Sequence, residues 1–141
     1  MNNLKKAYFA GGCFWCTEAV FLRLKGVEKA IPGYCGGNYE NPTYEQVCSG
    51  ITGHAETVLI EYDSDLISYE MLLDVFFRTH DPTTINRQGN DVGKHYRSAI
   101  FYTDLEQKKY AENFIKKCNE DGLFKKRIVT QLEPLKEFYT A

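Results

Sequence analysis

The fold begins with the stretch KAYFAGGCFWC, residues 6–16, which predicts a strand, a glycine turn and the start of a helix. Residues 6–10 are mostly apolar, as in a buried strand, and the helical pattern after the glycines runs to about Leu24. Cys13 and Cys16 lie one turn apart where this helix starts. Unpaired N–H groups and the positive end of the helix dipole favour a thiolate there. The stretch therefore predicts both the first unit of the fold and a redox site.

The composition is that of one globular domain. The chain has 141 residues, of which 43% are hydrophobic and 14% aromatic, so we expect a single domain over residues 1–141 with one core. The net charge is −2, with 17 basic and 19 acidic residues, which argues against nucleic acid as a partner. No window is long and apolar enough for a membrane span, and the apolar run before Cys13 is too short for export, so we expect a cytoplasmic protein.

The order of predicted elements indicates an α+β fold. Strands are predicted at about residues 6–10, 27–34, 57–62, 98–102 and 128–132, with a tail from Pro134 onward. A helix follows the first, third and fourth of these strands, and Gly122 ends the last helix. This order is a split βαβ pattern, so we expect a two-layer α/β sandwich of the ferredoxin-like plait type, with helices packed on one face of a mixed sheet.

Local signals fix several of these elements. The clearest helix has apolar residues at helical spacing, and Ser68 is placed to cap it. The members of that stripe are Tyr69, Leu72, Leu73, Phe76 and Phe77. Thr43-Tyr44-Glu45-Gln46 matches a capping box that opens a short helix. Residues 81–95 form a polar loop of a length that is more often functional than idle.

The five cysteines differ in their settings. Cys118 lies on the apolar stripe of its helix and Cys48 follows Val47, so we expect both to be packed. Cys35 is either a loop thiol or a packed residue. The spacing of Cys13 and Cys16 favours redox chemistry. Structural zinc needs four ligands, whereas the three histidines, His54, His80 and His95, are isolated in the sequence, so we expect no metal.

Other polar residues supply what a nucleophilic thiol needs. Glu56 lies where a loop enters a strand; in a dry pocket its pKa rises and it becomes a proton donor at neutral pH. Tyr44 and Tyr96 lie near loop ends, where phenols can donate hydrogen bonds to an oxygen atom. Phe14 and Trp15 beside the thiol indicate a pocket for an apolar group.

Several ordered motifs together resemble the A-type peptide methionine sulfoxide reductases. The motifs are GCFW (12–15), GYCGG (33–37), NPTY (41–44), VCSG (47–50), GHAE (53–56), HDPT (80–83), NRQGNDVG (86–93) and YRS (96–98). The resemblance implies repair of oxidised proteins under oxidative stress, with selectivity for the S epimer of the sulfoxide. It implies no bound cofactor and an external thiol reductant, thioredoxin or another dithiol.

The resemblance also assigns roles to residues. Cys13 is the nucleophile that attacks the sulfoxide sulfur, and Glu56 protonates the sulfoxide oxygen, which is otherwise a poor leaving group. Tyr44 and Tyr96 match tyrosines that hydrogen-bond this oxygen. Phe14 and Trp15 match the walls around the substrate methyl group. Asp91 matches an acidic residue that binds the substrate backbone.

The second thiol departs from the family pattern. Many members have glycine where Cys16 stands and carry the resolving thiol in a C-terminal tail, whereas residues 119–141 contain no cysteine. Cys16 is therefore the first candidate to resolve the Cys13 sulfenic acid, and Cys35 is the second. A cycle that uses Cys13 and an external thiol alone is a third possibility.

Two other classes of protein remain open at this stage. A general thioredoxin-like disulfide oxidoreductase would use Cys13 and Cys16 but would not need Glu56. A non-catalytic redox sensor would leave Tyr44 and Asp91 unexplained. We expect a monomer, and substrates that include peptide-bound and free methionine sulfoxide.

Overall fold

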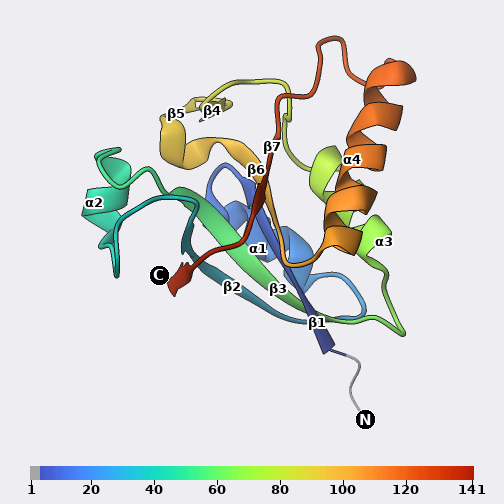
Figure 1. Cartoon of the computed structure of the whole chain (residues 1–141), viewed down its shortest axis with the longest axis horizontal. Coiled ribbons are helices and arrows are strands. Elements are labelled where there is room, and N and C mark those ends of the chain that lie inside the picture. Colours follow the sequence, from blue (N-terminus) through green and yellow to red (C-terminus); the bar gives the residue numbers. More distant parts are fainter. Residues whose placement is uncertain (1–3) are drawn as a thin grey trace.

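A six-stranded sheet forms the centre of the computed structural model, which describes residues 4–141 (Figure 1). Its strands, in spatial order, are β7 (Gln131–Pro134), β6 (Ser98–Tyr102), β1 (Leu4–Gly11), β3 (Ala55–Asp63), β2 (Val27–Cys35) and β8 (Phe138–Thr140). β3 is inserted between β1 and β2 and is antiparallel to both, while β6 and β7 are parallel. The arrangement confirms the split βαβ plait and the mixed sheet.

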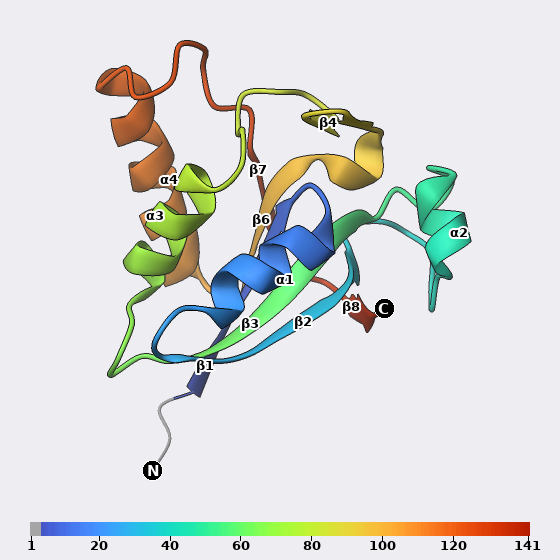
Figure 2. The same ribbon diagram turned by 180° about the vertical axis from the view of Figure 1, so that it is seen from behind.

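Helices cover one face of this sheet. They are α1 (Phe14–Leu22), α3 (Tyr69–Arg78) and α4 (Leu105–Glu120), whereas the short α2 (Tyr44–Cys48) lies beyond the end of the sheet. Figure 2 shows α1 in front of the strands, and α3 beside them in front of α4. Alternate residues of β1, including Ala7 and Phe9, face these helices, and the Phe9 ring stacks on Phe76 at 4.8 Å.

The predicted helix signals are confirmed. All five apolar residues of the α3 stripe are buried, and Ser68 Oγ accepts a hydrogen bond from the backbone N–H of Met71 at 3.1 Å. Thr43 and Gln46 form the expected capping box at α2. Cys118 is 7% exposed on the buried side of α4, as expected.

The C-terminal segment covers the other face, and here the sequence prediction was wrong. The last strand begins at Gln131 rather than near residue 128, and the tail after Pro134 contains β8, which pairs with β2. Phe138 packs on Tyr8 with ring centroids 5.4 Å apart. Gly33 permits this contact, because a Cβ there would lie 2.3 Å from the Phe138 ring. The signal was missed because β8 has only three residues and depends on pairing with β2.

The polar loop folds over the start of α1. It contains β4 (Arg87–Gln88), β5 (Asp91–Val92) and a 3₁₀ helix, η1 (Lys94–Tyr96). The Gln88 side-chain amide makes two hydrogen bonds with the backbone of Asp81. Its Oε1 accepts from the Asp81 N–H at 2.7 Å, and its Nε2 donates to the Asp81 carbonyl oxygen at 2.9 Å. Gln88 also packs on Gly12, where φ is +98° and a Cβ would lie 2.7 Å from Gln88 Cγ. Only glycine fits this turn, so the loop and the first thiol are held together.

Within residues 4–141, no helix combines the length and the apolar character that a membrane crossing requires. The single domain predicted for residues 1–141 includes residues 1–3, which lie outside the described part of the chain.

Candidate active site

Cys13 is the N-cap residue of α1. Its carbonyl oxygen accepts hydrogen bonds from the Thr17 backbone N–H at 3.2 Å and from Thr17 Oγ1 at 3.3 Å, which fixes the first turn. The Cys13 side chain makes no capping hydrogen bond. The half-buried thiol therefore lies at the positive end of the helix without being used to close it.

Glu56 lies beside Cys13 and is almost completely buried. It is 2% exposed, and its Oε1 accepts a hydrogen bond from the Phe14 backbone N–H at 3.2 Å. Glu56 Oε2 is buried without a hydrogen-bond partner. Burial raises the pKa of Glu56 to about 7, the Phe14 N–H opposes the rise, and the negative charge of Asp91 adds to it. The carboxyl group can therefore carry a proton at neutral pH, next to a nucleophile.

Two tyrosines converge on this carboxyl group from separate elements. Tyr96 comes from η1, and burial together with the nearby Glu56 raises its pKa. Tyr44 opens α2, and a hydrogen bond with Cys48 is the main cause that raises its pKa, with Glu56 contributing. Both phenols therefore keep their protons and can donate hydrogen bonds.

Aromatic rings form one wall of the site. Phe14 is 1% exposed and packs on Tyr34, with ring centroids 5.6 Å apart. Trp15 is 56% exposed and stacks on the Tyr44 ring at 5.9 Å. A buried ring and an exposed ring thus border the thiol, as expected for a pocket that holds an apolar group.

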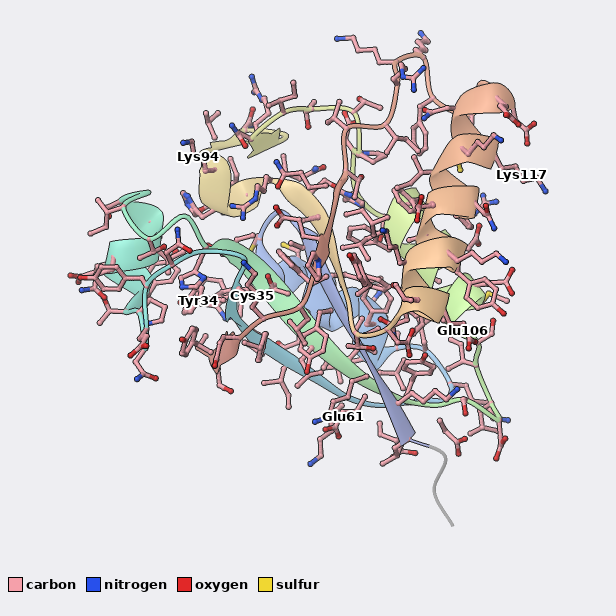
Figure 3. All side chains as sticks on the ribbon, in the orientation of Figure 1. Tyr34, Cys35, Glu61, Lys94, Glu106 and Lys117 are labelled. Atoms are coloured by element: carbon pink, nitrogen blue, oxygen red, sulfur yellow. The ribbon has the colours of Figure 1, made fainter. Side chains whose placement is uncertain are left out.

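The two candidate resolving thiols have different positions. Cys16 is exposed, and a hydrogen bond with Cys13 is the first cause that raises its pKa. Tyr34 and Cys35 are neighbours on β2 (Figure 3), and successive strand residues point to opposite faces. Because Tyr34 faces Phe14, Cys35 faces the side of the sheet that the C-terminal segment covers. Its Sγ hydrogen-bonds Thr57 Oγ1 on the neighbouring strand β3 at 3.3 Å.

Asp91 lies in β5, at the exposed edge of the site. A cavity of about 150 Å³ is bordered by Asp91, Cys13, Cys16 and Gln88. The negative charge of Asp91 also raises the pKa values of Cys16 and Glu56. The fold thus brings the eight predicted site residues to one end of the molecule.

The family model described as "Peptide methionine sulfoxide reductase" matches residues 5–141. This chain belongs to that family. The relative named "Peptide methionine sulfoxide reductase MsrA" from Acinetobacter baumannii (strain AYE) is 56% identical over 138 residues, which cover 98% of this chain and 78% of the relative.

Two solved structures of one other protein share the fold. The reduced form of Mxr1 from Saccharomyces cerevisiae superposes with a TM-score of 0.92 at 33% identity, over 99% of this chain and 80% of the other. Mxr1 in complex with Trx2 gives a TM-score of 0.73 at 26% identity, over 99% and 81% of the two chains. The resemblance inferred from the motifs is therefore confirmed.

Two histidines of the reductase motifs link elements of the fold, and His80 also lines the cavity beside Cys13. His54 Nδ1 accepts a hydrogen bond from the Gly37 N–H at 3.0 Å, so its Nε2 donates to the Tyr39 carbonyl oxygen at 2.6 Å. His80 bonds the Phe76 carbonyl oxygen and Ser98 Oγ, and burial lowers its pKa to about 4. His54 therefore links the loop after β2 to the start of β3, and a neutral His80 links the end of α3 to β6.

Cys48 and His95 are site residues that the sequence analysis missed. Cys48 is half-buried rather than packed, and one ligand atom each of Cys48, Glu56 and His95 lies within 4.8 Å of the others. Burial lowers the pKa of His95, although Asp91 opposes this change. These residues lie far apart in the sequence, so the isolation of His95 along the chain does not hold in space. The capping box predicts a helix in which Cys48 lies one turn after Tyr44, on the same face. This is the sequence signal that could have placed Cys48 beside a predicted site residue.

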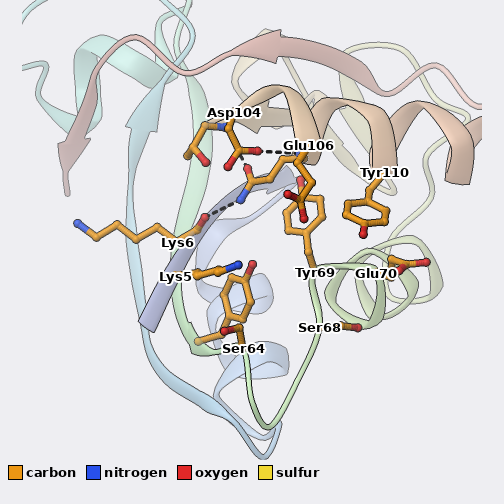
Figure 4. A pocket seen from close by; sticks show the side chains of 12 residues that line it. Lys5, Lys6, Ser64, Ser68, Tyr69, Glu70, Asp104, Glu106 and Tyr110 are labelled. Atoms are coloured by element: carbon orange, nitrogen blue, oxygen red, sulfur yellow. Dashed lines mark hydrogen bonds between the residues drawn. The ribbon is translucent and has the colours of Figure 1, made fainter. Parts of the chain in front are cut away.

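A larger cavity of about 410 Å³ lies at the other end of β1, near Lys5 and Lys6 (Figure 4). Its lining contains carboxylates, lysines and tyrosines but no thiol or imidazole. The Gln107 amide crosses it to the Lys6 carbonyl oxygen at 2.9 Å. Cys13 and Cys16 instead line the smaller cavity of about 150 Å³.

Proposed function

We propose that this protein reduces the S epimer of methionine sulfoxide, in peptides and as the free amino acid, to methionine. The observation that supports this most directly is the pair formed by Cys13 and Glu56. The Phe14 N–H that hydrogen-bonds Glu56 belongs to the residue directly after Cys13. This bond holds the Glu56 carboxyl group against the turn that carries the nucleophile. A sulfoxide needs both groups, because its oxygen leaves only after protonation.

The first step oxidises Cys13. Its Sγ attacks the sulfoxide sulfur while Glu56 delivers a proton to the oxygen, with Tyr44 and Tyr96 donating hydrogen bonds to the same atom. The sulfur–oxygen bond breaks and water leaves, so that Cys13 Sγ is bonded to the substrate sulfur as a sulfonium. A water molecule then attacks Cys13 Sγ, the sulfur–sulfur bond breaks with its electron pair on the methionine sulfur, methionine leaves, and Cys13 becomes a sulfenic acid. Phe14 and Trp15 hold the substrate methyl group, and Asp91 binds the substrate backbone.

The second step forms a disulfide. The Cys16 thiol, one turn after Cys13 at the start of α1, attacks the sulfenic sulfur, forms the disulfide and releases water. An external dithiol of the thioredoxin type then reduces the disulfide and is itself oxidised. The complex of Mxr1 with Trx2 supports such a partner, because Mxr1 shares this fold. Cys35 faces the other side of the sheet, which favours Cys16 as the resolving thiol.

The cycle suits a reducing compartment. Its five cysteines are free, and a disulfide that must be reduced in each turnover requires a constant supply of thiols. We therefore propose a cytoplasmic location for the protein. We also propose that it is a monomer without a bound cofactor, and that its role is the repair of oxidised proteins.

A single-turnover experiment tests this function. The fully reduced protein is mixed with one equivalent of N-acetyl-methionine S-sulfoxide, without external reductant, and the R epimer serves as the matched control. We expect one methionine per protein and the loss of two alkylatable thiols with the S epimer only. Insulin reduction without sulfoxide turnover would instead assign a general disulfide oxidoreductase.

A further inference from the structure

The geometry points to a zinc site in the substrate pocket: we propose that Cys48, Glu56 and His95 bind Zn²⁺, and that zinc and methionine sulfoxide exclude one another. The zinc site stands on the structure alone, whereas the mutual exclusion rests on the proposed role of Glu56.

The three donor groups are of the types that zinc binds. A thiol sulfur, a carboxylate oxygen and an imidazole nitrogen lie within 4.8 Å of one another. Zinc binds this mixed set of ligands at about 2.0–2.3 Å, which separates tetrahedral ligand atoms by about 3.3–3.8 Å. The three groups therefore need to approach one another by at most about 1–1.5 Å. Three protein ligands leave one tetrahedral position for water.

One carboxylate oxygen of Glu56, Oε2, lacks a hydrogen-bond partner. Oε1 is bound to the Phe14 N–H, but Oε2 has no hydrogen-bond partner although the residue is 2% exposed. A buried carboxylate oxygen without a partner is costly unless a ligand supplies one. A cation bound by Cys48 and His95 would supply it.

The surroundings hold the ligands in place and favour positive charge. The His95 ring lies against Gly93, where a Cβ would come within 2.6 Å of it, and against the Tyr96 ring at 4.0 Å. Tyr44 lies one turn before Cys48 on α2 and interacts with it strongly enough to raise the pKa of the phenol, and a phenol donor stabilises a thiolate ligand. The carboxylate of Asp91 acts electrostatically on both Glu56 and His95.

The competing site is the Cys13–Cys16 pair, which can also take up zinc. The experiment therefore uses the Cys13→Ser/Cys16→Ser protein, which lacks this dithiol and cannot turn over sulfoxide. Co²⁺ is titrated first, because its thiolate charge-transfer band counts sulfur ligands, and Zn²⁺ then displaces it. Circular dichroism verifies that each variant is folded.

We expect one Co²⁺ bound through one thiolate, displaced by one Zn²⁺. Adding Cys48→Ser should abolish the band, and adding His95→Gln should weaken zinc binding at least tenfold. Cys118→Ser, which removes a thiol remote from the site, is the matched control and should leave the band unchanged. Saturating N-acetyl-methionine S-sulfoxide should raise the apparent Kd for zinc at least tenfold.

Two outcomes overturn the proposal: loss of all metal binding in the Cys13→Ser/Cys16→Ser protein, or a thiolate band that survives Cys48→Ser. Turnover of metal-free wild type is measured in parallel. Turnover without zinc binding refutes the zinc site alone. Zinc binding without turnover refutes the proposed function and the mutual exclusion of zinc and methionine sulfoxide, but supports the zinc site itself.

Discussion

Replacing Glu56 by glutamine should separate catalysis from folding. The amide oxygen of glutamine can still accept the Phe14 N–H that bonds Glu56 Oε1 at 3.2 Å, so the start of α1 keeps its anchor. Glutamine cannot deliver a proton to the sulfoxide oxygen. Loss of a general acid lowers rates by about 10²–10⁴-fold, so we expect kcat/KM to fall by at least about 100-fold.

The same substitution should change how stability depends on pH. Raising the pKa from the ordinary 4.5 to about 7 means that the folded state binds the Glu56 proton more tightly than the unfolded state. This stability is fully present below about pH 4.5 and is lost as the pH rises through about 7. At about 1.4 kcal/mol per tenfold change in proton affinity, the loss is about 3 kcal/mol. Glutamine does not ionise, so the free energy of unfolding of the variant should not show this loss. Relative to wild type, the variant should therefore become more stable by about 3 kcal/mol as the pH rises from below 4.5 to above 7.

Two assays measure these effects. Turnover of N-acetyl-methionine S-sulfoxide with dithiothreitol gives kcat/KM, and urea unfolding at pH 5 and pH 8 gives the free energy of unfolding. Glu61→Gln, on the same strand β3, is the matched control and should keep activity within about twofold. The reasoning fails if Glu56→Gln keeps activity within tenfold, or if its stability relative to wild type is the same at both pH values.

The remaining predictions concern the thiols, the aromatic wall and α2. Cys16→Ser should leave a sulfenic acid on Cys13 that dimedone traps, whereas Cys35→Ser should form the same disulfide as wild type; an unchanged disulfide in the first variant would exclude Cys16. Phe14→Ala should cost about 3–5 kcal/mol in urea unfolding, because the ring is buried. Trp15→Ala should cost under about 1 kcal/mol but raise KM about tenfold, and equal KM values would remove Trp15 from the pocket. Thr43→Ala should lower stability by about 1 kcal/mol through loss of the capping box, measured by thermal melting.

Local signals predicted the elements that depend on neighbouring residues. The stripe of α3 was predictable because its five apolar residues repeat at helical spacing and Ser68 supplies a cap within three residues. The strand β8 was not predictable, because three residues carry little periodicity and its partner β2 lies about a hundred positions earlier in the chain.

The site divides in the same way. The sequence by itself determined that Cys13 and Cys16 lie together, because one helical turn separates them, and the ordered motifs indicated the roles of Glu56 and Asp91. Only the tertiary structure decided that Cys48 and His95 meet Glu56, and that Cys35 faces away from Cys13. The physical reason is that contacts within one turn follow from backbone geometry, whereas contacts between α2, β3 and η1 exist only once the sheet has set the place of each element.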